Sequence, residues 1–396
     1  MLRRSWLLAA LFLLPHAQAT AADPTPDCQY WCAQADIGRF LAEVQGSACA
    51  LDAPCQDGLP AVNLAALNGN LEAVTRLLDA GAAVDTRGPS LSTPLHAAAV
   101  NGHDDVVRLL LSRGSVVDPE SYGRTTPLML AAEKGRLSTA RILVEASARI
   151  DALDAKGHTV LGGAVASHEA PLVTFLLERS EPHTPEKLGS LLLVATAGND
   201  PATMRILLDH GASPGARWPD DGATALMIAA HNGHVEATAF LADRKAPLGA
   251  TDKAGKTALH HALEAEHPDV AAILIRAGAP IQVKDADGET PLLLAEDPIT
   301  VRSLVQRGAD VNASNVLGAT ALLRASVRGD LESLEILLGK GATVDTCTRW
   351  GMSPLSVAYA GGYLRVATRL LEAGANPAFK TEGTCQRPKQ AAQASP

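Results

Sequence analysis

A short motif returns ten times along this chain at nearly constant spacing. Successive copies start 30 to 34 residues apart, and most of the intervals are 33 residues. A fixed period of this length indicates a stacked array, in which each repeat buries its apolar face against its neighbours. The period therefore predicts a solenoid of about ten similar units. The copies start at Pro60, Thr93, Thr126, Thr159, Ser190, Thr224, Thr257, Thr290, Thr320 and Ser353.

Each copy carries the signals for two helices. Thr or Ser at the start can accept hydrogen bonds from free N–H groups, and Pro one place later fits the first helical turn. Further on, Leu71, Val74, Leu77 and Leu78 recur at three- and four-residue steps, which gives a second helix one apolar face. A glycine such as Gly81 then ends that helix, because glycine adopts the left-handed conformation at low cost. The chain is therefore predicted to be all-α.

The copy over residues 93–103 reads TPLHAAAVNGH and resembles an ankyrin repeat. The resemblance extends from about residue 60 to about residue 380. It implies an ankyrin-repeat solenoid of about ten helix-turn-helix repeats with long β-hairpin-like loops. It also implies that partner proteins contact the loop tips and the exposed face of the first helices.

The histidines do not predict a metal site, and no cofactor is expected. His96 and His260 occupy the fourth place of their repeats, where the resemblance implies hydrogen bonds between neighbouring repeats. His103 and His234 follow the glycine of the helix-to-helix turn, which the resemblance also makes a structural position. His261 is adjacent to His260, and consecutive helical residues point to different faces, so the two are not expected to share a ligand.

The chain divides into four segments. Arg3 and Arg4, an apolar run over residues 6–14 and a small-residue site ending at Ala19 predict a secretory signal peptide, with an uncleaved anchor as the alternative. No later window is long and apolar enough to span a membrane. The predicted segments are the signal peptide (1–19), a cysteine-containing capping segment (20–59), the repeat domain (60–379) and a polar tail (380–396).

The charge balance argues against nucleic acid as a partner. The full chain has a formal net charge of −9, from 34 basic and 43 acidic residues. Cleavage after Ala19 removes two arginines and makes the mature chain more acidic still. Affinity for nucleic acid depends on basic patches that displace counterions, and the sequence has no such run.

The six cysteines lie near the two ends of the repeat array. An even number of cysteines in an exported protein favours disulfides, and bridges at the ends would staple the repeats that have only one neighbour. We expect two pairings among the first four cysteines, with a four-thiolate zinc site as the alternative, and one pairing between the last two. The first four are Cys28, Cys32, Cys49 and Cys55, and the last two are Cys347 and Cys385.

Two repeats depart from the pattern. The fifth lacks the Thr-Pro-Leu-His wording at Ser190, and the loops on both of its sides have unusual lengths. The eighth has 18 residues from Thr290 to Gly308 where the other repeats have 21, and it contains Pro298. We expect its helix pair to be shorter by nearly one turn. Relaxed constraint and a functional irregularity explain both departures equally well.

The sequence contains no recognised catalytic motif, and we predict that the protein is not an enzyme. Asp285, Asp287, Glu289 and Glu296 match the spacing of oxygen ligands in a calcium-binding loop. Thr290 stands where that loop requires glycine, so this segment is instead predicted to begin the eighth repeat. Three aspartates that precede loop glycines, Asp154, Asp252 and Asp285, are expected to bond the backbone of their own turns.

Aromatic residues at the loops are the first candidates for partner contacts. Tyr122 and Trp350 each precede a loop glycine, and Trp218 lies on a lengthened loop. Large rigid side chains are favoured as binding anchors, although packing against an adjacent loop is an equal alternative. Tyr363 lies with Tyr359 near the end of the last repeat's first helix, where they and Trp350 would form one aromatic patch. Burial of Tyr359 in place of a small core alanine is the alternative.

Charged residues give a second set of candidates. Asp220 and Asp221 lie on the loop of the sixth repeat, near Asp287 and Glu289 of the eighth, and a basic partner surface would suit them. A solvated edge that only aids solubility is the alternative. Ile228, His261 and Arg324 occupy one repeat position, and their variation fits both a recognition surface and neutral drift.

These features together predict an exported scaffold that binds another protein. The favoured role is an inhibitor or immunity protein that blocks a toxic periplasmic enzyme. The alternatives are an accessory or protective factor for a periplasmic or oxidative-stress enzyme, and a cell-wall binding protein. The short leader and the alanine- and arginine-rich usage suggest a bacterial protein, which we expect in the periplasm, with an extracellular location as the alternative. The sequence predicts no oligomeric state.

Overall fold

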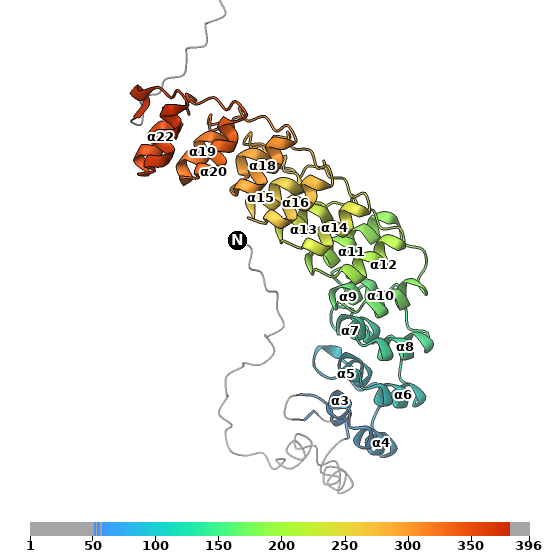
Figure 1. The fold of residues 1–396 in the computed structure, drawn as a ribbon. Helices are drawn as coiled ribbons and strands as arrows, with labels where there is room; N and C mark the ends of the chain where they lie inside the picture. The colour runs from blue at the N-terminus through green and yellow to red at the C-terminus, as the bar shows by residue number, and fades with distance from the viewer. Residues whose placement is uncertain (1–50, 53, 56–57, 381–396) are drawn as a thin grey trace, which may run out of the picture. The chain divides into compact units, whose positions relative to one another are not determined.

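The computed structural model describes residues 51–52, 54–55 and 58–380. Helix pairs follow one another along this part of the chain (Figure 1). The chain divides into two compact units, one up to Pro127 with residues 145–147, and one over residues 128–144 and from Ala148 onward. The predicted signal peptide, most of the capping segment and the tail after residue 380 lie outside the described residues.

The first helix of a pair starts directly after the predicted start residue in nine of the ten repeats of the described chain. The exception is the fifth repeat. The first helices are α3 (Ala61–Leu67), α5 (Pro94–Asn101), α7 (Pro127–Glu133), α9 (Val160–Ala166), α11 (Pro185–Ala197), α13 (Ala225–His231), α15 (Ala258–Glu264), α17 (Pro291–Leu294), α19 (Ala321–Arg328) and α21 (Pro354–Ala360).

The second helices pack behind the first ones and bury the leucines that the periodicity singled out, such as Leu77. In the unit from Ala148 onward, the odd-numbered helices from α9 to α21 stack as one layer of first helices (Figure 1). The even-numbered helices from α10 to α22 stack as a second layer, formed by the second helices. The second helices are α4 (Leu71–Asp79), α6 (Asp104–Ser112), α8 (Leu137–Glu145), α10 (Ala170–Leu177), α12 (Pro201–Asp209), α14 (Val235–Asp243), α16 (Pro268–Arg276), α18 (Pro298–Gln306), α20 (Leu331–Leu338) and α22 (Leu364–Glu372).

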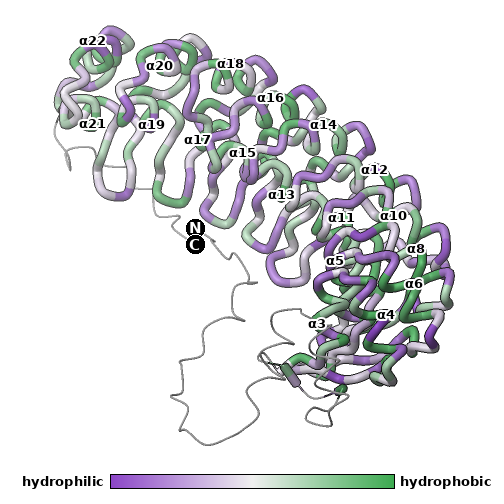
Figure 2. Tube along the Cα trace, turned by 90° about the horizontal axis from the view of Figure 1, so that it is seen from below, coloured by the Kyte–Doolittle hydropathy of each residue, from purple (hydrophilic) through white to green (hydrophobic). Residues whose placement is uncertain are grey.

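In the repeats other than the fifth, the loop before the first helix folds back on itself, and we call it the finger of that repeat. Isolated antiparallel bridges close several fingers, for example Leu153 with Thr159, Arg217 with Thr224 and Ser314 with Thr320. Figure 2 shows the fingers from α13 to α21 projecting from the same side of the first helices. Two short 3-10 turns complete the described structure, η1 (Pro89–Leu91) in the second finger and η2 (Pro377–Lys380) after α22.

The fifth repeat corrects one sequence prediction. Ser190 does not cap its first helix but lies inside α11, which is 13 residues long. Thr184 caps this helix instead, since its hydroxyl accepts the Lys187 N–H at 3.3 Å, and Pro185 takes the first helical place. Thr184-Pro185 is itself the capping signature of the other repeats. The added helical residues replace the part of the chain that forms a finger elsewhere.

The eighth repeat has the expected short helix pair. Its first helix, α17, contains only four residues, and Ala295 leaves the helix with extended backbone dihedrals. Asp297 then caps α18 by accepting the Thr300 N–H at 2.8 Å, and Pro298 begins that helix. Pro298 therefore starts the second helix and does not kink it, because proline lacks only an N–H that is free at this position.

The described part of the chain contains two of the six cysteines. Cys55 is buried and Cys347 is half-buried, and neither is a free thiol. The other four cysteines lie outside the described residues, so the expected pairings remain predictions. No helix among the described residues has both the length and the apolar character needed to cross a membrane.

Candidate protein-binding surface

Backbone hydrogen bonds join the finger tips of the last five repeats. In each case an N–H at one tip donates to a carbonyl of the preceding tip, at 2.8 to 3.0 Å. We call this row of bonds the finger ladder. Its bonds run from Lys253 to Asp221, from Ala286 to Ala254, from Val316 to Asp287 and from Arg349 to Leu317. The ladder makes a continuous edge from finger 6 to finger 10.

A carboxylate or amide inside each turn sets the shape of several fingers. One side-chain oxygen of Asp252 accepts the N–H groups of Ala254 and Lys256, at 2.9 and 2.8 Å. Asp285 and Asp154 make the same paired bonds in their own turns, as predicted, and Asn315 makes them in finger 9. Asp285 therefore holds a turn, and α17 begins after Thr290, so this segment begins the eighth repeat as predicted.

The buried side chain of His260 links the seventh repeat to the eighth. Its Nδ1 accepts the Thr257 N–H at 3.2 Å and lies 2.8 Å from the Thr257 hydroxyl. The proton is therefore on Nε2, which donates to the Glu289 carbonyl at 3.2 Å. Burial lowers the pKa of His260, and the carbonyl contact opposes this only in part. We call this arrangement the histidine latch.

His96 forms an equivalent latch in the second repeat. Its Nδ1 accepts the Thr93 N–H at 3.2 Å, and its Nε2 donates to the Thr125 carbonyl at 2.9 Å. His103 and His234 contact carbonyls of the preceding repeat, those of Leu67 and Thr196. The expectation that these four histidines are structural is confirmed.

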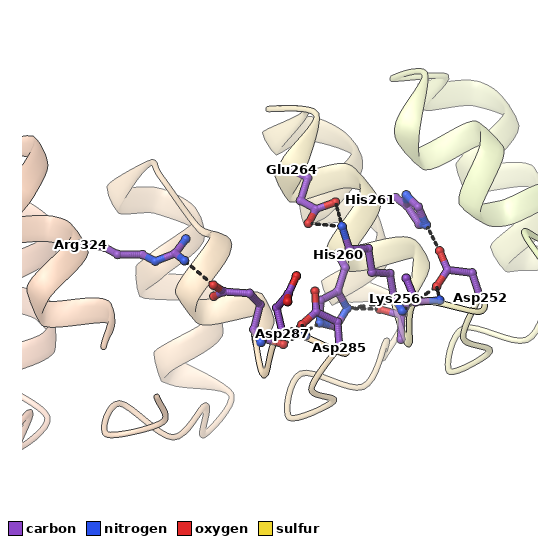
Figure 3. Close-up of polar contacts among 11 residues, drawn as sticks. Asp252, Lys256, His260, His261, Glu264, Asp285, Asp287 and Arg324 are labelled. Carbon is purple, nitrogen blue, oxygen red and sulfur yellow. Dashed lines mark hydrogen bonds and ion pairs between the residues drawn. The ribbon is translucent and has the colours of Figure 1, made fainter. Parts of the chain in front are cut away.

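We call the face formed by the first helices and the adjoining sides of the fingers the inner surface. Charged residues pair across it in the seventh repeat (Figure 3). Lys256 at the end of finger 7 binds Glu264 of α15, with an N–O distance of 2.6 Å. Burial alone would lower the pKa of Lys256, but the carboxylates of Glu264, Asp285 and Asp252 together raise it above its ordinary value. His261 Nε2 lies 2.9 Å from an oxygen of Asp252, and its ring meets the edge of His231 with centroids 5.9 Å apart.

A second polar group connects the eighth repeat to the ninth. Glu289, which is nine-tenths buried, accepts from Arg324 of α19 and from the side-chain amide of Asn315, the latter at 2.7 Å. Figure 3 shows Arg324 reaching back from its helix toward this finger. The sequence placed His261 and Arg324 at one repeat position but did not identify their carboxylate partners. Those partners lie on the fingers before α15 and α17: Asp252 is nine residues before His261 in the same repeat, whereas Glu289 is 35 residues before Arg324 and belongs to the preceding repeat.

The predicted anchors differ in exposure. Tyr122 is 82% exposed and Trp350 is 54% exposed, whereas Trp218 is half-buried and closes its own turn through backbone bonds to Ala223 and Gly222. Asp220 and Asp221 are exposed beside Trp218. Tyr363 is 38% exposed and does not lie on a finger, because it caps the start of α22.

Sequence reasoning missed Val316, which is 62% exposed at the tip of finger 9. Its neighbour on finger 10, Trp350, carries the Arg349 guanidinium 4.6 Å from its ring centroid, a cation–π contact. The ladder bond from Arg349 to Leu317 joins these two tips. Comparing the same finger position in all repeats would have found Val316, since Asp220 in finger 6 and Lys253 in finger 7 are polar at this place.

Comparison with known proteins gives matches along most of the chain. A family model described as "Ankyrin repeats (3 copies)" matches residues 30–121, 161–252, 191–285, 246–315 and 294–381. A second, described as "Ankyrin repeat", matches residues 124–155.

Among curated relatives, Rabankyrin-5 from Homo sapiens is 36% identical over 90 residues, or 22% of this chain and 8% of that protein. Ankyrin repeat domain-containing protein 37 from Homo sapiens is 36% identical over 59 residues, 15% of this chain and 37% of that protein. The protein mask-1 of Caenorhabditis elegans, which contains ankyrin repeats and a KH domain, is 41% identical over 76 residues, 19% of this chain and 3% of that protein. The chain thus matches well under two thirds of the length of each relative.

Proposed function

Because the chain belongs to the ankyrin repeat family, we propose that it is a non-catalytic scaffold that binds another protein through its finger ladder and the adjoining inner surface. The observation that carries this proposal is the exposed pair Val316 and Trp350 on two bonded finger tips. The ladder holds these apolar side chains in place before binding. A preformed surface loses little conformational entropy on association, so a few anchors suffice.

The acidic finger tips set the character of the expected partner. Asp220, Asp221 and Asp287 are exposed on fingers 6 and 8. Lys253 lies between them on finger 7, but its ammonium group already donates to the carbonyls of Pro219 and Asp220, at 3.0 and 2.6 Å. Basic side chains of a partner would approach these aspartates, while an apolar group covers Val316 and Trp350.

The proposal includes export to a bacterial periplasm. The leader over residues 1–19 supports it, as does the lack of a free thiol at Cys55 and Cys347, because disulfides persist in oxidising compartments. We propose that Cys347 pairs with Cys385 and that Cys55 pairs within the group Cys28, Cys32 and Cys49. These bridges would hold the two ends of the array closed.

Within that compartment, we propose that the protein inhibits a toxic enzyme, as an immunity protein does. Two roles compete with this one. The protein could be an accessory or protective factor for a periplasmic or oxidative-stress enzyme, or it could bind cell-wall material. The activity of a captured enzyme separates them, since an inhibitor abolishes that activity and an accessory factor preserves or raises it.

Affinity capture from a periplasmic extract tests the surface. The mature wild-type protein, Trp350→Ala and Val316→Ser are compared with Val116→Ser. This matched control replaces a valine of similar exposure (55%) that belongs to the other compact unit and makes no ladder bond. We expect the two ladder variants to retain less than about a tenth of the captured partner and the control to retain all of it. Equal capture by all four proteins would contradict the proposed surface.

A further inference from the structure

An exposed isoleucine distinguishes the second helix of the eighth repeat. Ile299, the second residue of α18, is 79% exposed. The same place is acidic in five other repeats, with Glu72, Asp105, Glu236, Asp269 and Glu332. An acidic residue there interacts favourably with the positive end of the helix dipole. The eighth repeat gives up this interaction and presents an apolar side chain to solvent.

The short helix α17 leaves an arginine of the next repeat partly without partners. Arg328, at the end of α19, donates one Nη2–H to the Ala295 carbonyl at 3.3 Å, where α17 ends early. Its Nε is buried and has no acceptor among the described residues. A buried guanidinium nitrogen without an acceptor is costly, and a carboxylate is the acceptor that best matches it.

More apolar surface lies around this arginine. Val327, which precedes Arg328, is 51% exposed. Gly329 follows Arg328, and the Tyr363 ring lies so close over it that no Cβ would fit there. Leu364 comes next to Tyr363 and is 66% exposed. The end of α19 thus joins exposed apolar residues of the ninth and tenth repeats, and Arg328 connects it to the eighth.

We call Ile299, Val327, Arg328, Tyr363 and Leu364 the turn edge. These residues lie at the turns between the first and second helices, whereas the fingers precede the first helices. The turn edge is therefore a different surface from the finger ladder. Within the described residues it combines exposed side chains of four large apolar residues with one buried unsatisfied donor.

We propose that the turn edge is a second docking surface, for a segment of a partner protein that carries apolar side chains on both sides of an acidic residue. The apolar side chains cover Ile299, Val327 and Leu364. The carboxylate pairs with the guanidinium group of Arg328, whose Nε has no acceptor among the described residues. This site does not depend on the finger ladder and can be present whether or not the ladder binds.

A fluorescein-labelled synthetic pentapeptide, with one glutamate between two pairs of leucines, tests this site by fluorescence anisotropy against the full mature protein. We expect binding, and a loss of about tenfold in affinity when the glutamate of the peptide is replaced by lysine. Failure of the wild-type protein to bind the glutamate peptide, or equal affinity for both peptides, would show that the turn edge does not recognise this chemistry.

Variants locate the peptide on the protein. Ile299→Glu introduces the type of residue that other repeats carry at this place, so the fold is expected to persist. Arg328→Gln removes the guanidinium cation that would pair with the carboxylate. Each should lower peptide affinity about tenfold, while Val316→Glu on the finger ladder should leave it within twofold. Unchanged affinity in both turn-edge variants, or an equal loss in Val316→Glu, would overturn this proposal. Neither result would contradict the proposed binding function of the finger ladder.

Sedimentation velocity distinguishes one further occupant. We expect the wild-type protein and Ile299→Glu to have the same oligomeric state. If the wild-type chain self-associates and Ile299→Glu abolishes the association, the turn edge is an interface between copies of this chain and the proposed partner segment is wrong.

Discussion

The seventh and eighth repeats are neighbours with similar fingers, yet they are joined to their successors in different ways. Both use an aspartate, Asp252 or Asp285, to shape the finger. The seventh then places His260 at the fourth position of its motif, where the imidazole joins its own cap to the next finger. The eighth has Leu293 at that position, and its first helix stops after four residues.

The difference shows that two kinds of interaction can hold adjacent repeats. A latch satisfies buried backbone groups inside the array, so it depends on a neutral histidine. The eighth repeat depends instead on the ion pair of Glu289 with Arg324, which lies nearer the inner surface. The eighth repeat lacks a histidine that would contact its capping residue, and the buried hydroxyl of Thr290 has no partner among the described residues. Four measurements can break or sharpen this contrast.

The largest effect is expected for His260→Leu, which gives the seventh repeat the residue type of the eighth. The buried Thr257 N–H loses its acceptor and the Glu289 carbonyl loses one donor. We expect the free energy of unfolding, measured by urea titration, to fall by about 3 kcal/mol. A fall below about 1 kcal/mol would mean that the latch is not what joins these repeats.

Arg324→Met tests the link from the eighth repeat to the ninth. It removes the cation and leaves the nine-tenths buried Glu289 carboxylate with only the Asn315 amide as a side-chain partner. We expect a loss of about 2 kcal/mol in the same titration, less than for a fully buried pair because Arg324 is partly exposed. Glu289→Gln in the Arg324→Met background should recover part of this loss, and an additive further loss would contradict the explanation.

The latch predicts that the stability of the protein depends on pH. Burial lowers the pKa of His260 and of His96 below their ordinary value of 6.5. Below that pH the unfolded chain binds a proton that the folded chain does not, so stability is complete above pH 6.5 and falls as the pH drops toward the folded-state pKa.

Each latch should cost at most about 1.4 kcal/mol per pH unit in that window. Urea titrations at several pH values between 5 and 8 measure the slope. In His260→Gln the slope should be smaller than in the wild-type protein, because one titrating group is gone. An unchanged slope would exclude His260 as a source of the pH dependence.

The smallest effects come from a matched pair at the capping residues. Thr257→Val removes a hydroxyl that lies 2.8 Å from His260, and we expect a loss of about 1 kcal/mol. Thr290→Val removes a buried hydroxyl without a partner among the described residues, so stability should change by less than about 0.5 kcal/mol or rise. Equal losses in the two variants would mean that the two caps do not differ.

Much of this contrast could be predicted from local sequence signals. The Thr-Pro signature predicted where the first helices begin. The three residues that the eighth repeat lacks predicted its short helix pair. The same signature explains the error at Ser190, because Thr184-Pro185 carries it six residues earlier and local capping prevailed over the period. The start of this first helix could therefore be predicted when the Thr-Pro signature was sought directly and not placed by the 33-residue period alone.

The side-chain pairs of the inner surface could not be predicted in this way. Arg324 and Glu289 are 35 residues apart, slightly more than one period, and each had other charged residues at a similar separation. Their pairing depends on which rotamers the stacked helices allow and on how deeply Glu289 is buried. The exposure of Trp218 was also beyond the sequence, since it depends on how its turn closes against Ala223.

The finger ladder also has a mechanical consequence. Its four main-chain bonds join five tips in series along one edge, while each tip is anchored separately to its own helix pair. A force spread evenly over the tips loads the anchors in parallel, and the bonds between tips carry little of it. A force on finger 10 alone tends to peel the bonds open one at a time, starting from Arg349. A ligand that grips several tips at once therefore resists extraction far better than one of equal affinity that grips the last tip only.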